Sequence, residues 1–159
     1  MFIDIEKSTD KIKNYQLLLD NLKYYLNKED NLITNLSNLS AYLNYFLDDI
    51  NWVGFYLYDG LKLYLGPFQG LPACTTIKLG NGVCGVSAEE RNTVIVDDVD
   101  KFPTHIVCDS RSKSEIVIPI IKYDKLIGVL DIDSSSFSRF NIDDKIHLEK
   151  LITKLVDII

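Results

Sequence analysis

Hydrophobic residues recur every three or four positions towards both ends of the chain, whereas they alternate with polar residues or form short runs through its middle. Helical spacing extends from Asp10 to about Lys28, directly after Ser8-Thr9-Asp10, whose side chains suit a helix N-cap. The same spacing extends from Leu32 to Asp49, and it returns in a closing helix that begins near Asn141. The pattern therefore predicts two helices before the middle of the chain and one after it.

The middle of the chain predicts β-strands joined in hairpins. Trp52–Tyr58 meets Leu61–Gly66 through Asp59-Gly60, a dipeptide that strongly favours a tight turn. The run NGVCGVSAEER predicts a tight turn that enters a short helix. Further strands are predicted at Thr75–Leu79, Thr93–Asp98, Glu115–Lys122 and Leu126–Asp133.

Helices at both ends and hairpins between them predict one α+β domain over residues 1–159. A chain of 159 residues is about one ordinary domain long, enough to bury a single core. We expect a central antiparallel sheet, with the N- and C-terminal helices packed together on one face. The other face would then be free to build a ligand pocket.

Composition and charge exclude several function classes. Hydrophobic residues make up 47% of the chain and charged residues 25%, which is typical of a globular protein. A net charge of −6 opposes binding to nucleic acid or to an anionic membrane. The chain shows no signal peptide and no apolar run long enough to cross a bilayer, so a cytoplasmic location is expected. An odd number of cysteines, three, is a poor disulfide framework and suits the same compartment.

The first predicted strand has two different faces. Val53, Phe55 and Leu57 form an apolar face, because neighbouring residues of a strand point to opposite sides. Trp52 and Tyr56 share the other face, where their rings either close the edge of the core or form the wall of a small-molecule pocket. The strand by itself favours the first interpretation.

Three carboxylates are expected together on one face of the second hairpin. If residues 123–125 form its loop, Val117 lies opposite Asp131 and Glu115 lies opposite Asp133. Like charges so placed are unfavourable unless a cation lies among them or one carboxyl keeps its proton. A solvated sheet edge is the alternative, and a two-residue loop would break the alignment.

The three cysteines are Cys74, Cys84 and Cys108, and each could be an inert buried thiol. A structural zinc site would need all three together with His105, but no CxxC pair is present and the spacing matches no zinc module. Cys108 follows the apolar run HIV and precedes the polar run DSRS, where local donors and a cation favour a lowered thiol pKa. A loop cysteine that can meet a second cysteine suits a redox enzyme.

The motifs GPFQG, C-T-x-I, GVCG, H-I-x-C-D, SEIV-x-P and LDIDS follow one another between Asn51 and Ser134. In this combination the chain resembles the free methionine-(R)-sulfoxide reductases, a branch of the GAF fold, over nearly its whole length. The resemblance implies a GAF-like domain that reduces free L-methionine (R)-sulfoxide to methionine without a cofactor. It also implies thioredoxin as the reductant and a homodimer as the assembly.

The resemblance assigns roles to eight residues. Cys108 matches the cysteine that attacks the sulfoxide sulfur, Cys74 the main resolving cysteine and Cys84 an auxiliary one. Trp52 matches the tryptophan that packs on the thioether methyl group, with Tyr56 beside it. The residues that match carboxylates lining the substrate pocket are Glu115, Asp131 and Asp133.

The implied reaction fits the chemistry of these residues. A carboxyl whose pKa is raised by its neighbours can protonate the sulfoxide oxygen, and the remaining carboxylates can hold the substrate ammonium. The substrate carboxylate would bind backbone N–H groups at the helix start near Asn81-Gly82. Attack leaves a sulfenic acid on Cys108, and Cys74 then condenses with it, which requires Cα atoms within about 7 Å.

Two other functions are compatible with parts of this pattern. A non-catalytic GAF module that binds a small molecule would share the fold but not the thiol-dependent turnover. A small metal-binding protein would bind zinc stoichiometrically.

Overall fold

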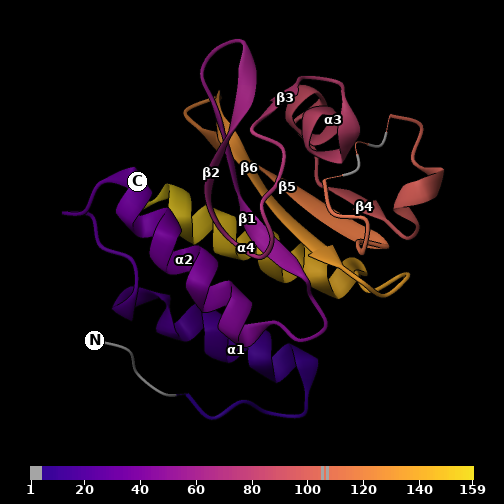
Figure 1. Cartoon of the computed structure of the whole chain (residues 1–159). Helices are drawn as coiled ribbons and strands as arrows, with labels where there is room; N and C mark the ends of the chain where they lie inside the picture. Colours follow the sequence, from indigo (N-terminus) through magenta and orange to yellow (C-terminus); the bar gives the residue numbers. More distant parts are fainter. Residues whose placement is uncertain (1–4, 105, 107) are drawn as a thin grey trace.

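In the computed structural model, which describes residues 5–104, 106 and 108–159, the strands form a six-stranded antiparallel sheet (Figure 1). The strand order is β3-β2-β1-β6-β5-β4. The strands are β1 (Trp52–Tyr58), β2 (Lys62–Gln69), β3 (Thr76–Lys78), β4 (Val94–Val96), β5 (Ser114–Lys122) and β6 (Lys125–Ser134). Helices precede, interrupt and follow this sheet, which confirms the predicted α+β class.

The helices α1 and α4 begin where the sequence predicts, and a side chain caps each of them. Asp10 accepts a hydrogen bond from the Lys13 amide at the start of α1, and Asn141 accepts hydrogen bonds from the Asp143 and Asp144 amides at the start of α4. The helices and 3₁₀ turns are α1 (Lys11–Asn21), η1 (Leu22–Tyr24), α2 (Leu32–Phe46), α3 (Gly82–Glu90), η2 (Val99–Lys101) and α4 (Ile142–Val156).

The first two helices end earlier than their apolar spacing predicts, because long-range hydrogen bonds engage the backbone beyond them. The Asn27 amide donates to the buried side chain of Asn35, which in turn donates to the Asn27 carbonyl, so the chain folds back onto α2. The Asp48 carbonyl, just after the end of α2, accepts two hydrogen bonds from Arg139. These bonds fix the segment after α2 in a non-helical conformation. Helical periodicity alone does not reveal such partners.

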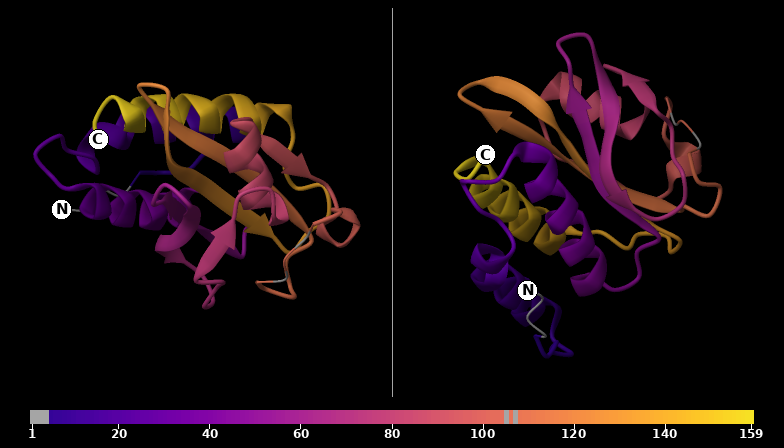
Figure 2. Two further views of the ribbon diagram at one scale, coloured as in Figure 1. Left: turned by 90° about the horizontal axis from the view of Figure 1, so that it is seen from above. Right: turned by 60° about the vertical axis from the view of Figure 1, so that its left-hand side comes forward.

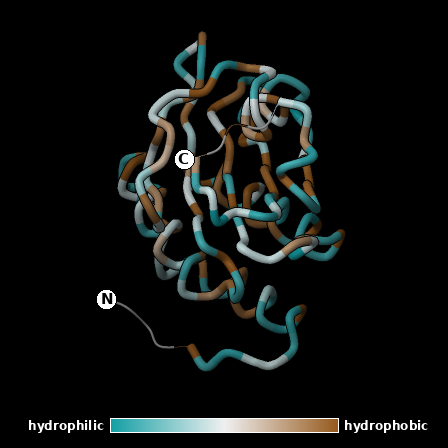
Figure 3. Tube along the Cα trace, turned by 45° about the vertical axis from the view of Figure 1, so that its right-hand side comes forward, coloured by the Kyte–Doolittle hydropathy of each residue, from teal (hydrophilic) through white to brown (hydrophobic). Residues whose placement is uncertain are grey.

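Helices cover one face of the sheet. α2 packs on β1 and β2, α4 packs on β5, and α1 packs on α4, whereas α3 lies on the opposite face (Figure 2). The larger hydrophobic core lies between the sheet and these three helices and includes Val53 and Phe55 of β1. Hydrophobic positions concentrate on the interior strands in Figure 3. Of the helices that the structure describes, none is long and apolar enough to cross a membrane.

The β5–β6 hairpin has the predicted strand pairing, but its turn is shorter than predicted. Lys122 pairs with Lys125 across a two-residue turn, in which Tyr123 and Asp124 both have positive φ angles. Such a turn would shift every pair by one position, but a bulge between Ile120 and Ile121 restores the alignment. The expected three-residue loop is therefore wrong, whereas the expected pairing further along the strands is confirmed.

Candidate active site

The sheet face opposite the three packed helices carries a smaller hydrophobic core, covered by α3. Trp52 and Tyr56, which are 2% and 1% exposed, belong to this core. Both side chains also line a small pocket that reaches Cys108. The two interpretations of these rings are therefore compatible, since the rings belong to the core and also form a pocket wall.

The aromatic wall depends on the glycine between its rings. The Trp52 ring stacks on Phe68 of β2, with centroids 5.3 Å apart, and on Tyr56 at 6.0 Å. A Cβ atom at Gly54 would lie 2.6 Å from the Trp52 ring and would also overlap Phe68. The Trp52 indole donates to the Leu71 carbonyl at 3.1 Å, which fixes the orientation of the ring. The protein itself therefore sets the orientation of this wall.

Glu115, Asp131 and Asp133 converge on the pocket, as the hairpin predicts. Glu115 lies opposite Asp133 and Val117 lies opposite Asp131 in the β5–β6 pairing. Glu115 and Asp131 are 7% and 6% exposed, so the predicted solvated edge is excluded for both. All three side chains line one cavity together with Cys84 and Cys108.

Burial raises the pKa of all three carboxyls. Burial, and then the charges of Asp131 and Asp133, raise the pKa of Glu115 well above its ordinary range. Burial raises the pKa of Asp131 to about 6, opposed by hydrogen bonds from Cys84 and Glu115. Burial and the charge of Asp131 raise the pKa of Asp133 as well. The pocket therefore combines proton donors with carboxylate at neutral pH.

Glu115→Gln is expected to unfold at a higher temperature than the wild type at pH 8, with the difference shrinking towards pH 4. Because the pKa of Glu115 is raised, the folded protein keeps a proton that the unfolded chain releases above its ordinary pKa of 4.5. Wild-type stability thus falls with rising pH, by about 1.4 kcal/mol per pH unit between the two pKa values. Glutamine does not ionise and avoids this loss. Thermal unfolding of both oxidised proteins from pH 4 to pH 8 tests this, and a pH-independent difference would contradict it.

Cys74 and Cys108 form a disulfide across 34 residues of sequence, with Cα atoms 5.6 Å apart. Cys74 lies just before β3, and the Tyr56 hydroxyl donates to its carbonyl at 3.1 Å. The aromatic wall therefore also supports the cysteine that Cys108 meets. This pair satisfies the separation that a disulfide requires.

A polar network holds the loop that carries Cys108. The Asn51 side chain donates to Asp109 Oδ2 and to Ser112 Oγ, both at 3.1 Å. Arg111 also donates to the Asp109 carboxylate, with 2.7 Å between Nη2 and Oδ2. These hydrogen bonds, first of all those from Arg111, lower the pKa of Asp109 to about 2. The cation expected to act on Cys108 is thus paired with the carboxylate next to it.

Cys84 is buried on α3 and is not part of the disulfide. Its sulfur lies 4.0 Å from Glu115 Oε1. Burial, and then the charges of Asp131 and Glu115, raise the pKa of this thiol well above its ordinary value. Cys84 is therefore a neutral thiol directly beside the carboxyl cluster. The predicted zinc alternative is not assembled from the three cysteines, and its fourth member, His105, lies outside the described residues.

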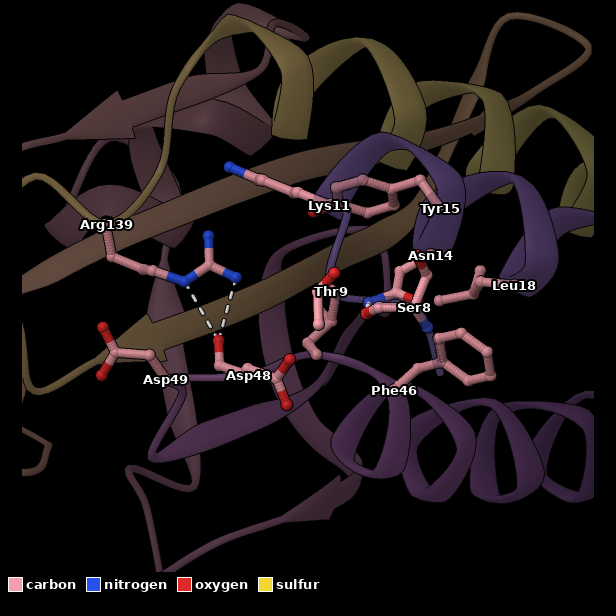
Figure 4. Close-up of a pocket in the computed structure, with 11 residues that line it drawn as sticks. Ser8, Thr9, Lys11, Asn14, Tyr15, Leu18, Phe46, Asp48, Asp49 and Arg139 are labelled. Carbon is pink, nitrogen blue, oxygen red and sulfur yellow. Dashed lines mark hydrogen bonds between the residues drawn. The ribbon is translucent and has the colours of Figure 1, made fainter. Parts of the chain in front are cut away.

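The cavity next to Cys108 is small, with a volume of about 30 Å³. The Thr104 carbonyl accepts a hydrogen bond from the Gly82 amide at 2.8 Å, and Gly82 and Ile106 both line this cavity. A larger cavity of about 510 Å³ lies between α1 and the end of α2, and Figure 4 shows Arg139 beside it, bonded to the Asp48 carbonyl. The cations Lys11 and Arg139 in its wall are already paired with the buried Asp144. This larger cavity is lined by no cysteine of the described chain.

The structure brings all eight residues singled out in the sequence to one side of the sheet. The sequence does not single out Asn51 or Phe68, and it includes Asp109 only as part of the polar run after Cys108. Asp109 is the direct neighbour of Cys108, which is a usable signal, whereas Asn51 and Phe68 act through contacts distant in sequence. Together the pocket offers a cysteine pair, a buried thiol, proton-holding carboxyls and an aromatic wall.

The chain is similar to several known proteins. The GAF domain family matches residues 31–155. The free methionine-R-sulfoxide reductase of Escherichia coli is 46% identical over 127 residues, which cover 80% of this chain and 77% of the relative. The reduced form of fRMsr from Staphylococcus aureus is 50% identical, with a TM-score of 0.85 and coverage of 98% of this chain and 97% of that one. The free methionine-R-sulfoxide reductase of Neisseria meningitidis, solved in complex with its substrate, is 38% identical with a TM-score of 0.93 and covers 99% and 95%.

Proposed function

This chain belongs to the GAF domain family and, within it, to the free methionine-R-sulfoxide reductases, and we propose that it reduces free methionine sulfoxide through attack by Cys108. The observation that carries the proposal is the Cys74–Cys108 disulfide beside a pocket with an aromatic wall and three carboxyls. A disulfide at this position is the product that thiol-dependent sulfoxide reduction leaves behind.

In the first step, the Cys108 thiolate attacks the sulfoxide sulfur while a carboxyl of the pocket protonates the sulfoxide oxygen. Oxygen passes to the cysteine, so the sulfoxide is reduced to a thioether and Cys108 is oxidised to sulfenic acid. Glu115 and Asp133 suit the role of proton donor because their pKa values are raised. The Trp52 ring, held by its bond to the Leu71 carbonyl, suits the methyl group of the substrate.

Recognition of the free amino acid would use both of its charges. Carboxylates of the pocket, among them Asp131, would hold the ammonium, and this relieves the repulsion within the cluster. The substrate carboxylate would bind backbone N–H groups at the start of α3 near Asn81-Gly82. In the disulfide form the Gly82 amide donates to the Thr104 carbonyl, so substrate binding to this amide would have to replace that hydrogen bond.

In the second step, the Cys74 thiol condenses with the sulfenic acid, which releases water and forms the disulfide. A dithiol protein must then donate an electron pair and two protons to restore both thiols, and thioredoxin is the proposed reductant. Cys84 is proposed as an auxiliary resolving cysteine, because it is buried beside the same cavity.

The same proposal covers the organisation of the protein. The 159 residues would form one domain, a view supported by hydrogen bonds from Lys11 and Tyr15 of α1 to Asp144 of α4. A homodimer in the cytoplasm is proposed on the resemblance and on the cysteine count, and light scattering would measure the assembly.

Cys74→Ser is expected to form about one methionine per protein molecule in a rapid burst and then to stall or turn over slowly through Cys84. The reason is that removal of the resolving thiol leaves the first chemical step intact. Mass spectrometry after one turnover should find a dimedone-reactive sulfenic acid at Cys108 of the variant and a Cys74–Cys108 disulfide in the wild type.

The corresponding Cys84→Ser variant distinguishes the two resolving roles. It should close the Cys74–Cys108 disulfide and continue turnover with thioredoxin. A mapped Cys84–Cys108 bond, together with undiminished turnover of Cys74→Ser, would exchange the two assignments. A GAF module without catalytic activity would instead bind methionine sulfoxide and form no methionine at all.

A further inference from the structure

Three metal-ligating atoms from three different elements meet at the base of the cavity. They are Cys84 Sγ on α3, a carboxylate oxygen of Glu115 on β5 and one of Asp131 on β6, and all lie within 4.8 Å of one another. Each of the three residues is buried. Three donors that enclose one point from separate elements form a partial coordination sphere.

An unpartnered atom is a second observation that points to a positively charged ligand here, which is the substrate ammonium when substrate is bound and a metal ion in its absence. Asp131 Oδ1 is one of two buried side-chain oxygen or nitrogen atoms in the described chain that have no hydrogen-bond partner. The Asp131 side chain lines the cavity, and the residue is 6% exposed. Buried acceptors without partners are rare in folded proteins, and a bound cation would satisfy this one.

The small volume of the cavity in the disulfide form limits the size of the ligand that it can hold. A volume of about 30 Å³ accommodates an ion, or one or two water molecules. An amino acid such as methionine sulfoxide is several times larger than this volume. The oxidised protein therefore offers a site for a small cation rather than for the substrate.

We propose that the oxidised protein binds one zinc ion between Cys84, Glu115 and Asp131. One thiolate and two carboxylates are ligands that zinc accepts in tetrahedral geometry, and water would complete the set. Zinc would displace the protons that Cys84 and Glu115 hold in its absence, and these protons would pass to solvent. Magnesium and calcium prefer more numerous oxygen ligands and do not favour thiolate, so neither fits this donor set. The proposal stands on the donor geometry and does not depend on the reductase activity.

Zinc bound here would occupy part of the pocket proposed for the substrate, since Cys84, Glu115 and Asp131 all line it. Zinc is thus expected to compete with methionine sulfoxide.

The binding experiment uses the purified oxidised protein, in which Cys84 is the one thiol left by the disulfide. Titration with zinc against a chromophoric chelator should give one tight site per chain. Cobalt in place of zinc should give a thiolate-to-cobalt charge-transfer band with the visible absorption of a tetrahedral site. Cys84→Ser should weaken zinc at least about 100-fold, since even outer-shell partners change affinity by 10–100-fold.

A matched control removes a carboxylate from the surface. Asp48→Asn changes a side chain that is 76% exposed and lies outside the proposed site, and it should bind zinc as the wild type does. Magnesium should not displace cobalt. The wild-type cobalt spectrum tests the proposal even if a variant fails to fold: its lack of a thiolate band, or undiminished zinc binding by folded Cys84→Ser, would overturn it. Because no step requires turnover, this result is independent of whether methionine sulfoxide is the substrate.

Discussion

Cys108→Ser is expected to lower methionine formation in a single turnover by at least about a thousandfold, because loss of a nucleophile removes the first chemical step. Neither other cysteine can replace it efficiently. Cys84 is a neutral thiol, since burial raises its pKa, and Cys74 does not line the cavity that contains the three carboxyls. A serine hydroxyl is a much poorer nucleophile towards sulfur than a thiolate.

The measurement mixes pre-reduced protein with methionine sulfoxide in the absence of reductant and quantifies methionine. Ser110→Ala is the matched control, because Ser110 is an exposed residue of the same loop and should retain the wild-type burst. Cys74→Ser should also retain the burst, so the two cysteine variants separate attack from resolution. Methionine release by Cys108→Ser at a rate close to that of the wild type would disprove the assignment.

A methionine sulfoxide that is acetylated at nitrogen and amidated at the carboxyl group is expected to react at least about 10⁴-fold more slowly in kcat/KM than the free amino acid. The blocked compound has no ammonium for the carboxylates of the pocket and no carboxylate for the start of α3. Its binding would leave buried polar groups unpaired, among them Asp131 Oδ1. The sulfoxide itself is unchanged, so the comparison isolates recognition from chemistry.

Two compounds, each blocked at one end, show how much of this discrimination comes from the ammonium and how much from the carboxylate of the substrate. The acetylated compound tests the carboxyl cluster, and the amidated compound tests the helix start near Gly82. If the cluster holds the ammonium, acetylation alone should account for a large part of the loss. Comparable activity on free and fully blocked substrate would contradict the proposed recognition and would favour sulfoxide in peptides as the substrate.

The carboxyl cluster shows how a correct prediction can rest on an incorrect detail. Alternation along β5 and β6 places Glu115, Asp131 and Asp133 on one face, and the structure has the same pairing. The predicted three-residue loop is wrong, because the two-residue turn at Tyr123-Asp124 is compensated by a bulge. Burial of the apolar face determines the register, since a shift by one residue would expose that face to water.

The helix ends and the anchoring of the Cys108 loop could not be predicted in the same way. Apolar spacing extends α1 to about Lys28, but hydrogen bonds between Asn27 and Asn35 end it earlier. Asn51 reaches Asp109 across 58 positions of sequence, and no local pattern marks either residue as a partner of the other. Such contacts exist only once the sheet has brought distant segments together.

The sequence by itself determined which segments of this protein are helices and strands, because hydrophobic periodicity and capping residues act over a few neighbouring positions. It also determined which side chains share a strand face, and therefore that Trp52 and Tyr56 lie on the face of their strand opposite Val53 and Phe55. Only the tertiary structure decided that Cys74 meets Cys108 and that Cys84 lies against Glu115 and Asp131. The physical reason is that disulfide geometry, burial and the pKa of each carboxyl depend on atoms a few ångströms away in space, which the order of residues does not reveal.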